Sequence, residues 1–158
     1  MKSVQEWVKQ LNMTAHPEGG YFVELMRSEQ TVESNKGNKT GLYTNIHFLL
    51  EDKNPSNFHR IASDEMWFYH DGNPLTVHII YPDGKYEAIK LGPNDGEVLS
   101  CVVPKDTVFG SSVDSGYALV SCVVVPGFLF EEFELFKRQE LLDKYPQHED
   151  IITKLTRD

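Results

Sequence analysis

The segment between residues 56 and 72 carries the side chains best suited to acid-base chemistry. Its period of two predicts a β-strand with Glu65, Trp67 and Tyr69 on one face. A carboxylate that leads two aromatic side chains is unusual on a solvated face, and it fits a strand that lines a cavity. His59 comes just before this strand, and we expect it to converge with Glu65 if the two strands pair. A carboxylate can orient a neighbouring imidazole, raise its pKa, or bind a metal with it. The alternative is a surface glutamate beside a structural histidine.

Other catalytic patterns are missing from the sequence. Its six histidines form neither a cysteine-rich zinc pattern nor a His-Glu-x-x-His motif. Nucleophile elbows, P-loops and Gly-x-Gly-x-x-Gly segments do not occur either. Cys101 and Cys122 lie in apolar runs, where a free cysteine behaves as a small hydrophobic residue. The sequence therefore gives little support to zinc hydrolases, serine hydrolases, nucleotide hydrolases or dinucleotide enzymes.

Composition limits the partners. The chain has 158 residues, of which 40% are hydrophobic, so we expect one domain over residues 1–158 with one core. With 15 basic and 24 acidic side chains the net charge is −9, and no basic stripe is present to bind nucleic acid or an anionic membrane. The N-terminus lacks the apolar core of a signal peptide, and no apolar run is long enough to cross a bilayer. We expect a cytoplasmic protein that binds a small molecule.

The pattern along the chain predicts an all-β fold. Residues 3–12 have helical spacing, and residues 31–41 are expected to form an exposed loop. Short strands follow at regular spacing, which favours an antiparallel sandwich or barrel over about residues 20–126. Helical spacing returns over residues 130–142 and 148–157, and we expect these C-terminal helices to pack on the outside of the barrel.

The central motif resembles those of the cupin superfamily. His59, Glu65 and Gly72 match the spacing of the first cupin motif, and residues 103–109 resemble the second. The similarity extends to a family of small single-domain cupins of unassigned function. It rests on segments spread over nearly the whole chain: His16-Pro-Glu-Gly-Gly-Tyr-Phe, Arg27-Ser28, Ser56-x-x-His-Arg, Asp64-Glu-x-Trp, Leu91-Gly92, Val103-Pro104 and Val125-Pro-Gly-Phe-x-Phe-Glu-x-Phe133. This resemblance implies a double-stranded β-helix, or jelly-roll barrel, and a homodimer.

The departures from the cupin motifs bear on cofactors. Ile61 and Phe109 stand where metal-binding cupins have histidines, and Asp106 replaces the glycine of the second motif. Only His59 and Glu65 remain of the usual three-histidine, one-glutamate set, so we expect no cofactor. A weak divalent metal site at these two residues is the alternative. His47 or His78 would supply a third ligand only if its strand faces the cavity.

A metal-free route is implied by similarity to the dTDP-sugar epimerases, which are metal-independent cupins with a histidine base and a tyrosine acid. By this resemblance, His59 oriented by Glu65 would be the base, and Tyr21 or Tyr69 the acid. Arg27 would clamp an anionic group, unless it simply pairs with Glu24.

We expect further side chains to contact the ligand, namely His16, Glu18, Asn57, Trp67, His47 and Phe109. For Trp67 and Phe109, burial in the core is the simpler alternative. The favoured interpretation is a cupin that binds a small, polar, anionic metabolite and transfers a proton on it, as an epimerase or isomerase does. The alternatives are a metal-dependent dioxygenase or isomerase, and a sensor domain without catalysis.

Overall fold

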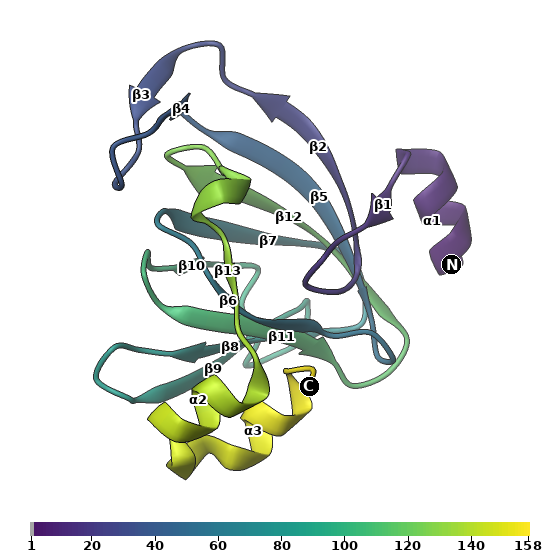
Figure 1. Cartoon of the computed structure of the whole chain (residues 1–158). Coiled ribbons are helices and arrows are strands. Elements are labelled where there is room, and N and C mark those ends of the chain that lie inside the picture. The colour runs from purple at the N-terminus through teal and green to yellow at the C-terminus, as the bar shows by residue number, and fades with distance from the viewer. Residues whose placement is uncertain (1) are drawn as a thin grey trace.

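Two antiparallel sheets enclose the core in the computed structural model, which describes residues 2–158 (Figure 1). The large sheet has the strand order β1 (Thr14–Ala15), β2 (Tyr21–Arg27), β5 (Thr44–Glu51), β12 (Tyr117–Val125), β7 (Asp64–Gly72) and β10 (Ser100–Val103). The small sheet has the order β13 (Glu134–Leu135), β6 (Ser56–Arg60), β11 (Val108–Val113), β8 (Leu75–Ile80) and β9 (Tyr86–Leu91). The predicted all-β jelly-roll barrel is confirmed.

Alternation along the strands decides which side chains enter the core. On β5, Ile46, Phe48 and Leu50 belong to the central hydrophobic cluster, while Leu49 packs on the opposite face. Because adjacent residues of a strand point to opposite faces, one such strand supplies both the core and the outer surface. The same alternation on β7 places Trp67 in the core.

The hairpin turns follow the sequence signals, with one correction. Residues 81–85 join β8 to β9, and the turn places Gly84 at a φ of +88°, a conformation that glycine adopts without strain. Residues 31–41 were expected to form a loop, but they fold into a hairpin of β3 (Thr31–Glu33) and β4 (Lys39–Gly41). Its strands have three residues each, and Val32 is the one apolar side chain in them apart from the glycine, so no hydrophobic alternation marked them.

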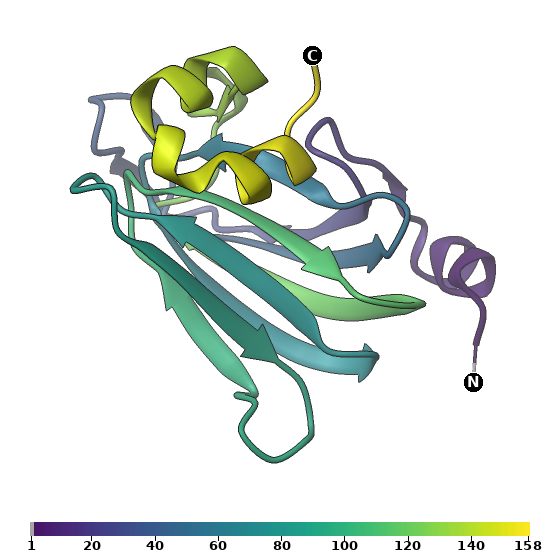
Figure 2. The same cartoon turned by 90° about the horizontal axis from the view of Figure 1, so that it is seen from below.

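Three α-helices lie on the outside of the barrel. The predicted N-terminal helix is α1 (Val4–Leu11), which begins with a capping box between Ser3 and Glu6 and packs on the outer face of the large sheet. The C-terminal helices α2 (Arg138–Lys144) and α3 (Glu149–Lys154) cover the outer face of the small sheet (Figure 2). None of the helices formed by residues 2–158 has the length and apolar character needed to span a membrane.

The predicted helix over residues 130–142 is wrong in its first half. Residues Phe130–Glu132 form a 3₁₀ turn, η1, and Glu134–Leu135 form β13, which pairs with β6; the helix α2 begins only at Arg138. The helical spacing of the aromatic side chains in this stretch has another cause. Phe130 and Phe133 line the cavity described next, whereas a helix would have packed them on the barrel surface.

Candidate functional site

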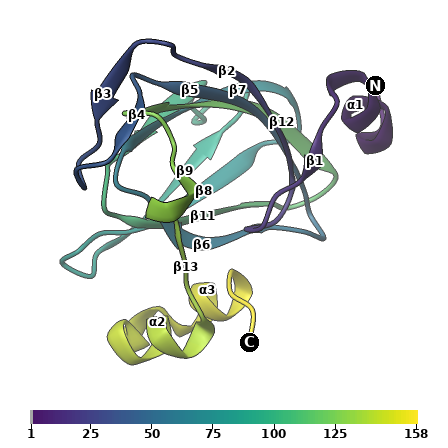
Figure 3. The same ribbon diagram turned by 45° about the horizontal axis from the view of Figure 1, so that its top comes forward.

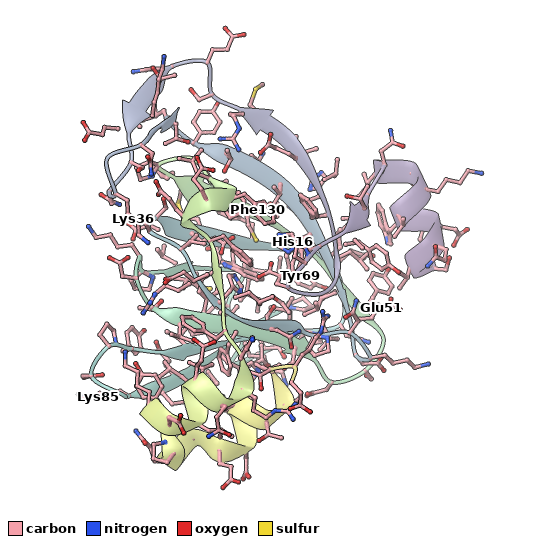
Figure 4. All side chains as sticks on the ribbon, in the orientation of Figure 1. His16, Lys36, Glu51, Tyr69, Lys85 and Phe130 are labelled. Carbon is pink, nitrogen blue, oxygen red and sulfur yellow. The ribbon has the colours of Figure 1, made fainter. Side chains whose placement is uncertain are left out.

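A cavity of about 440 Å³ opens between the two sheets, beneath η1, which lies across one end of the barrel (Figure 3). This volume falls in the range of small-molecule sites. Its polar and charged lining consists of His16, Glu18, Glu24, Arg27, Thr44, His59, Glu65 and Glu131. Its apolar lining consists of Phe22, Ile46, Ile61, Val124, Phe128, Leu129, Phe130 and Phe133. Figure 4 shows His16 inside the barrel and Phe130 on η1.

His59 and Glu18 form the closest polar contact in the cavity wall. Nδ1 of His59 lies 2.6 Å from Oε2 of Glu18 and 2.8 Å from the backbone oxygen of Asn57, and both side chains are buried. The hydrogen bond to the backbone oxygen of Asn57 favours the tautomer with the proton on Nδ1, and the carboxylate of Glu18 lies beside the same nitrogen as an ion-pair contact. The other ring nitrogen, Nε2, is then left to act as a proton acceptor.

A tight glycine turn brings Glu18 to His59. Gly19 and Gly20 have φ values of +116° and +81°, and a Cβ atom on Gly19 would lie 2.1 Å from the backbone oxygen of Pro55. Only glycine allows so close an approach between this turn and the start of β6. The backbone N–H of Asn57 also donates to the backbone oxygen of Glu18 at 2.7 Å. The turn and β6 are thus held together at the point where the carboxylate meets the imidazole.

A second imidazole lies beside the same carboxylate. Nδ1 of His16 accepts a hydrogen bond of 3.2 Å from the backbone N–H of Glu18 and lies 3.4 Å from Oε1 of that residue. Burial alone would raise the pKa of Glu18, but the two histidines outweigh this and lower it. Burial would lower the pKa of His59, but the charge of Glu18 outweighs it and the pKa of His59 is raised. For His16 the effect of burial is the larger one, so the pKa of His16 is lowered. The cluster therefore favours a charged Glu18–His59 pair beside a neutral His16.

Glu65 is the second buried carboxyl group of the cavity. Burial, followed by the negative charge of Glu18, raises its pKa from 4.5 to about 8. Glu65 is therefore mostly protonated at neutral pH, and a neutral carboxylic acid can donate a proton where a carboxylate cannot. Once His59 has lost its proton, the cavity therefore combines a proton acceptor at His59 with a proton donor at Glu65.

The predicted pairing of His59 with Glu65 is corrected by the sheet topology. The two residues lie on β6 and β7, which belong to different sheets and do not pair. They line the same cavity, but Glu18 occupies the position at Nδ1 that was expected for Glu65. The sequence placed Glu18 among the ligand contacts and gave no sign of this pairing, because it depends on the path of the glycine turn.

Charged residues of β2 line the cavity. Nη2 of Arg27 lies 3.0 Å from Oε1 of Glu24, and both side chains are about two-fifths exposed. The guanidinium also approaches Oγ1 of Thr40, at 3.4 Å. Both the anion-binding role expected for Arg27 and its pairing with Glu24 are therefore compatible with its position.

The β3–β4 hairpin holds the roof of the cavity. Oε2 of Glu132, in η1, accepts hydrogen bonds of 2.6 Å from Ser34 and from Asn38. Thr40 in the same hairpin donates to the backbone oxygen of Gly127 at 2.9 Å. The hairpin therefore shapes the cavity indirectly, through the segment that carries Phe128, Phe130 and Phe133. This aromatic roof was not predicted, although its signal was present as the phenylalanine-rich stretch after Pro126.

Six predicted site residues lie outside the cavity lining, and three of them take other positions in the fold. Tyr21 packs on the outer face of the large sheet with the cluster under α1, because Phe22, its neighbour, takes the inward position. Tyr69 packs against the central core, and its hydroxyl donates to the backbone oxygen of Gly72 at 2.6 Å. His47 sits on the outer face of β5, near His70. Neither tyrosine is therefore placed to act as the acid, and His47 cannot complete a metal site inside the barrel.

The remaining predicted ligand contacts lie behind the cavity wall and pack against its residues or hydrogen-bond to them. Phe109 packs on the ring of His59, with the centroids 4.2 Å apart, and Trp67 is buried in the core beside Phe109 and Phe48. Asn57 contributes its backbone rather than its side chain, as described above. For Trp67 and Phe109 the structure gives the core role that was the simpler alternative.

The cupin metal centre does not fit the residues present. Within residues 2–158, no group of three or more His, Cys, Asp or Glu side chains is arranged to hold a metal ion. Nδ1 of His59 faces Glu18, and Ile61 and Phe109, both buried, provide apolar side chains where metal-binding cupins have ligands. A metal at His59 and Glu65 would have too few protein ligands for tight binding.

Comparisons with known proteins identify the family. Residues 5–136 match the model of a family described as "Cupin superfamily (DUF985)". An uncharacterized protein of Saccharomyces cerevisiae is 33% identical over 159 residues, which cover 89% of this chain and 78% of the yeast protein. A hypothetical protein from Leishmania major has a TM-score of 0.96 and 39% identity, over 99% of this chain and 100% of that one. A protein from Shewanella oneidensis has a TM-score of 0.93 and 39% identity, over 99% of each chain.

A more distant likeness concerns the fold alone. Oxalate decarboxylase from Bacillus subtilis, an enzyme with Mn(II) centres, is 14% identical with a TM-score of 0.57. The match covers 89% of this chain but 36% of the decarboxylase. The family match and the two similar structures agree with the barrel fold. The chain belongs to the DUF985 family of the cupin superfamily.

Proposed function

We propose that this protein binds a small anionic metabolite in the barrel cavity and catalyses a proton transfer on it, as an epimerase or isomerase does. The observation that carries the proposal is the 2.6 Å contact between Nδ1 of His59 and Glu18 at the wall of that cavity. A buried carboxylate that fixes one imidazole nitrogen and leaves the other free is the usual arrangement of a histidine general base.

The proposed reaction removes a proton from a carbon atom next to a carbonyl group. The C–H bond breaks, its proton goes to Nε2 of His59, and its electron pair moves toward the carbonyl oxygen. Glu65 donates its carboxyl proton to that oxygen and so stabilises the enol form. Glu65 then takes a proton back from an enol hydroxyl as a carbonyl group re-forms. Transfer of the proton from Nε2 of His59 to the neighbouring carbon gives isomerisation, and protonation of the original carbon on its opposite side by a water molecule gives epimerisation. Glu65 thereby takes the acid role that was expected for a tyrosine.

Charge balance supports an anionic ligand with an apolar body. At the inner part of the cavity, the charge of Glu18 is balanced by His59, and Glu65 is mostly neutral, so this part carries little net charge. Arg27 is the guanidinium that lines the cavity, and it can form paired hydrogen bonds to a carboxylate or phosphate group. The phenylalanine side chains of the roof provide apolar contact between these two ends.

The test uses solvent deuterium, because it does not require the substrate to be known. The protein is incubated in D₂O with a small-molecule cell extract, and mass spectrometry identifies metabolites that gain deuterium. We expect the wild type to label one anionic metabolite or a small group of them, and His59→Asn and Glu65→Gln to abolish the labelling. Glu87→Gln, at an exposed position of β9 outside the cavity lining, is the matched control and should retain it. A ligand that is retained by the protein but never labelled would identify a sensor domain and contradict catalysis.

We also propose that the chain forms a homodimer in the cytoplasm. The large sheet presents apolar side chains to solvent, among them Met26, Phe68 and Val102, which are 53%, 37% and 52% exposed. Cys101 and Cys122 are both unbonded thiols, which suits a reducing compartment. Light scattering at micromolar protein concentration should give the mass of two chains, and the mass of one chain would contradict the dimer.

A further inference from the structure

The indole ring of Trp67 is held in the core, two residues along β7 from Glu65. Alternate residues of a strand share one face, so both side chains point to the inside of the barrel. The ring of Trp67 meets Phe48 edge to face at 6.0 Å and Phe109 at 6.5 Å, and the residue is 2% exposed. Packing on two sides therefore fixes the direction of the indole N–H.

The polar atom of this indole has no partner. Nε1 of Trp67 is buried and lacks a hydrogen-bond acceptor among residues 2–158. The other tryptophan of the chain differs, because Nε1 of Trp7 donates to Oη of Tyr117 at 3.1 Å. Buried indole N–H groups usually find an acceptor, so the unpaired one calls for a physical reason.

Glu65 is the group that this N–H can serve. Burial and the charge of Glu18 raise the pKa of Glu65 to about 8, and hydrogen bonding from Trp67 acts in the opposite direction. A donor at this place favours the carboxylate over the neutral acid, because a charged acceptor forms the stronger hydrogen bond. The N–H thus suits the form that Glu65 takes after it has given up its proton.

The other titratable groups near the indole are neutral or already paired. Cys101 of β10 and Cys122 of β12 are the cross-strand partners of Trp67. Burial raises the pKa of Cys101 to about 12 and that of Cys122 well above its usual value, so both thiols stay neutral. Glu18 and His59, the charged groups on the facing elements, are in contact with each other. The carboxyl group two residues along the strand is left as the acceptor.

We propose that Trp67 is a positioning residue for the acid of the cavity, and that its N–H donates a hydrogen bond to the Glu65 carboxylate once Glu65 has protonated the substrate oxygen. The O–H bond of Glu65 breaks and its proton goes to that oxygen, while the indole keeps its own proton. The proposal rests on the proposed proton transfer. A hydrogen bond that strengthens only as charge develops stabilises the transition state more than the bound substrate, so it raises the rate rather than the affinity.

Nitrogen-15 NMR of the indole groups tests the hydrogen bond without a substrate. The chain has two tryptophans, so the spectrum has two indole N–H signals, which Trp7→Phe and Trp67→Phe assign. We expect the Trp67 signal to shift as the pH rises through about 8, where Glu65 ionises, and to lose this shift in Glu65→Gln. A Trp67 signal that does not move in this range, or that moves equally in Glu65→Gln, would overturn the proposal.

The pKa of Glu65 measures the strength of the same bond. Carbon-13 NMR of the glutamate carboxyl groups gives this pKa, with the Glu65 signal identified by its loss in Glu65→Gln. Trp67→Phe keeps an aromatic ring and removes the N–H, so we expect the pKa of Glu65 to rise by about one unit.

The matched control is Trp7→Phe, which removes an N–H on the outer face of the large sheet and should leave the pKa of Glu65 unchanged. Circular dichroism shows whether each variant is folded. An unchanged pKa of Glu65 in folded Trp67→Phe contradicts the proposal, and if this variant does not fold, the indole signal of the wild type still decides.

Deuterium labelling separates the positioning role from the proposed function. We expect Trp67→Phe to label metabolites at about a tenth of the wild-type rate and Trp7→Phe at the full rate. Wild-type labelling that Trp67→Phe leaves unchanged would overturn the positioning role while the proposed function stands. A wild type that labels nothing would contradict the proposed function and the catalytic purpose of this bond, and the NMR titrations would still show whether the bond forms.

Discussion

Ionisation of Glu65 should make the protein less stable as the pH rises. Burial and the charge of Glu18 raise the pKa of this carboxyl from 4.5 to about 8, so the folded state binds its proton more tightly than the unfolded state. The resulting stabilisation is fully present below pH 4.5 and is lost as the pH rises through about 8. The difference between these two pKa values corresponds to about 5 kcal/mol in the free energy of unfolding, which is an upper limit because local opening admits water.

The perturbation is Glu65→Gln, which keeps the shape of the neutral carboxyl and removes its ionisation. Urea unfolding between about pH 5 and about pH 9 gives the free energy of unfolding of each protein. We expect the wild type to lose several kcal/mol relative to the variant over this range, so that the two curves converge or cross at high pH. Glu24→Gln, at an exposed position of the same cavity, should keep the wild-type slope. Identical slopes for the wild type and Glu65→Gln would refute the assignment of a neutral buried acid.

Three further predictions concern the pH profile, the ligand and a buried histidine outside the cavity. Because Glu18 raises the pKa of His59 despite burial, the rate of deuterium labelling should rise with pH above 6.5 as His59 loses its proton. The rate should then fall as the pH rises through about 8, because Glu65 ionises. A rate that does not change with pH would contradict both roles. Arg27→Gln should weaken binding of the labelled anion by roughly tenfold in calorimetry while the protein keeps its melting temperature; unchanged affinity would remove Arg27 from the site. Burial lowers the pKa of His78 from 6.5 to about 4, so its contribution to stability is present above pH 6.5 and is lost as the pH falls through about 4. Urea unfolding gives the free energy of unfolding at about pH 7 and at about pH 3. Between these two values the wild type should lose about 3 kcal/mol more than His78→Gln does, and equal losses would contradict the prediction.

The fold could be predicted because its signals are local. Alternation on β5 and β7, the Asp-Gly turn after β8 and the capping box of α1 each depend on a few neighbouring residues. The secondary structure was wrongly predicted where the spacing of apolar side chains reflects contacts with distant parts of the chain rather than local structure. Phe130 and Phe133 are spaced as on a helix, but they are held over the cavity by η1 and β13.

The candidate site was predicted in composition but not in arrangement. The spacing of the first cupin motif correctly predicted that His59 and Glu65 belong to the site. The glycine-rich segment correctly predicted His16 and Glu18. Their pairing could not be predicted, because Glu18 and His59 are brought together by a turn whose two glycines adopt positive φ angles and approach Pro55. The outward position of Tyr21 is likewise set by the register of β2 on β5.

The central claim is that the backbone oxygen of Asn57 and the carboxylate of Glu18 together keep the proton of neutral His59 on Nδ1 and leave Nε2 free to take a proton. Nitrogen-15 NMR of the histidine side chains tests it most directly, because the spectra identify which ring nitrogen carries the proton. At a pH where the imidazole is neutral, we expect His59 to carry its proton on Nδ1, and we expect the pKa of His59 to fall in Glu18→Gln because the carboxylate raises it in the wild type. A neutral His59 protonated on Nε2, or a pKa of His59 that is unchanged in Glu18→Gln, would contradict the account.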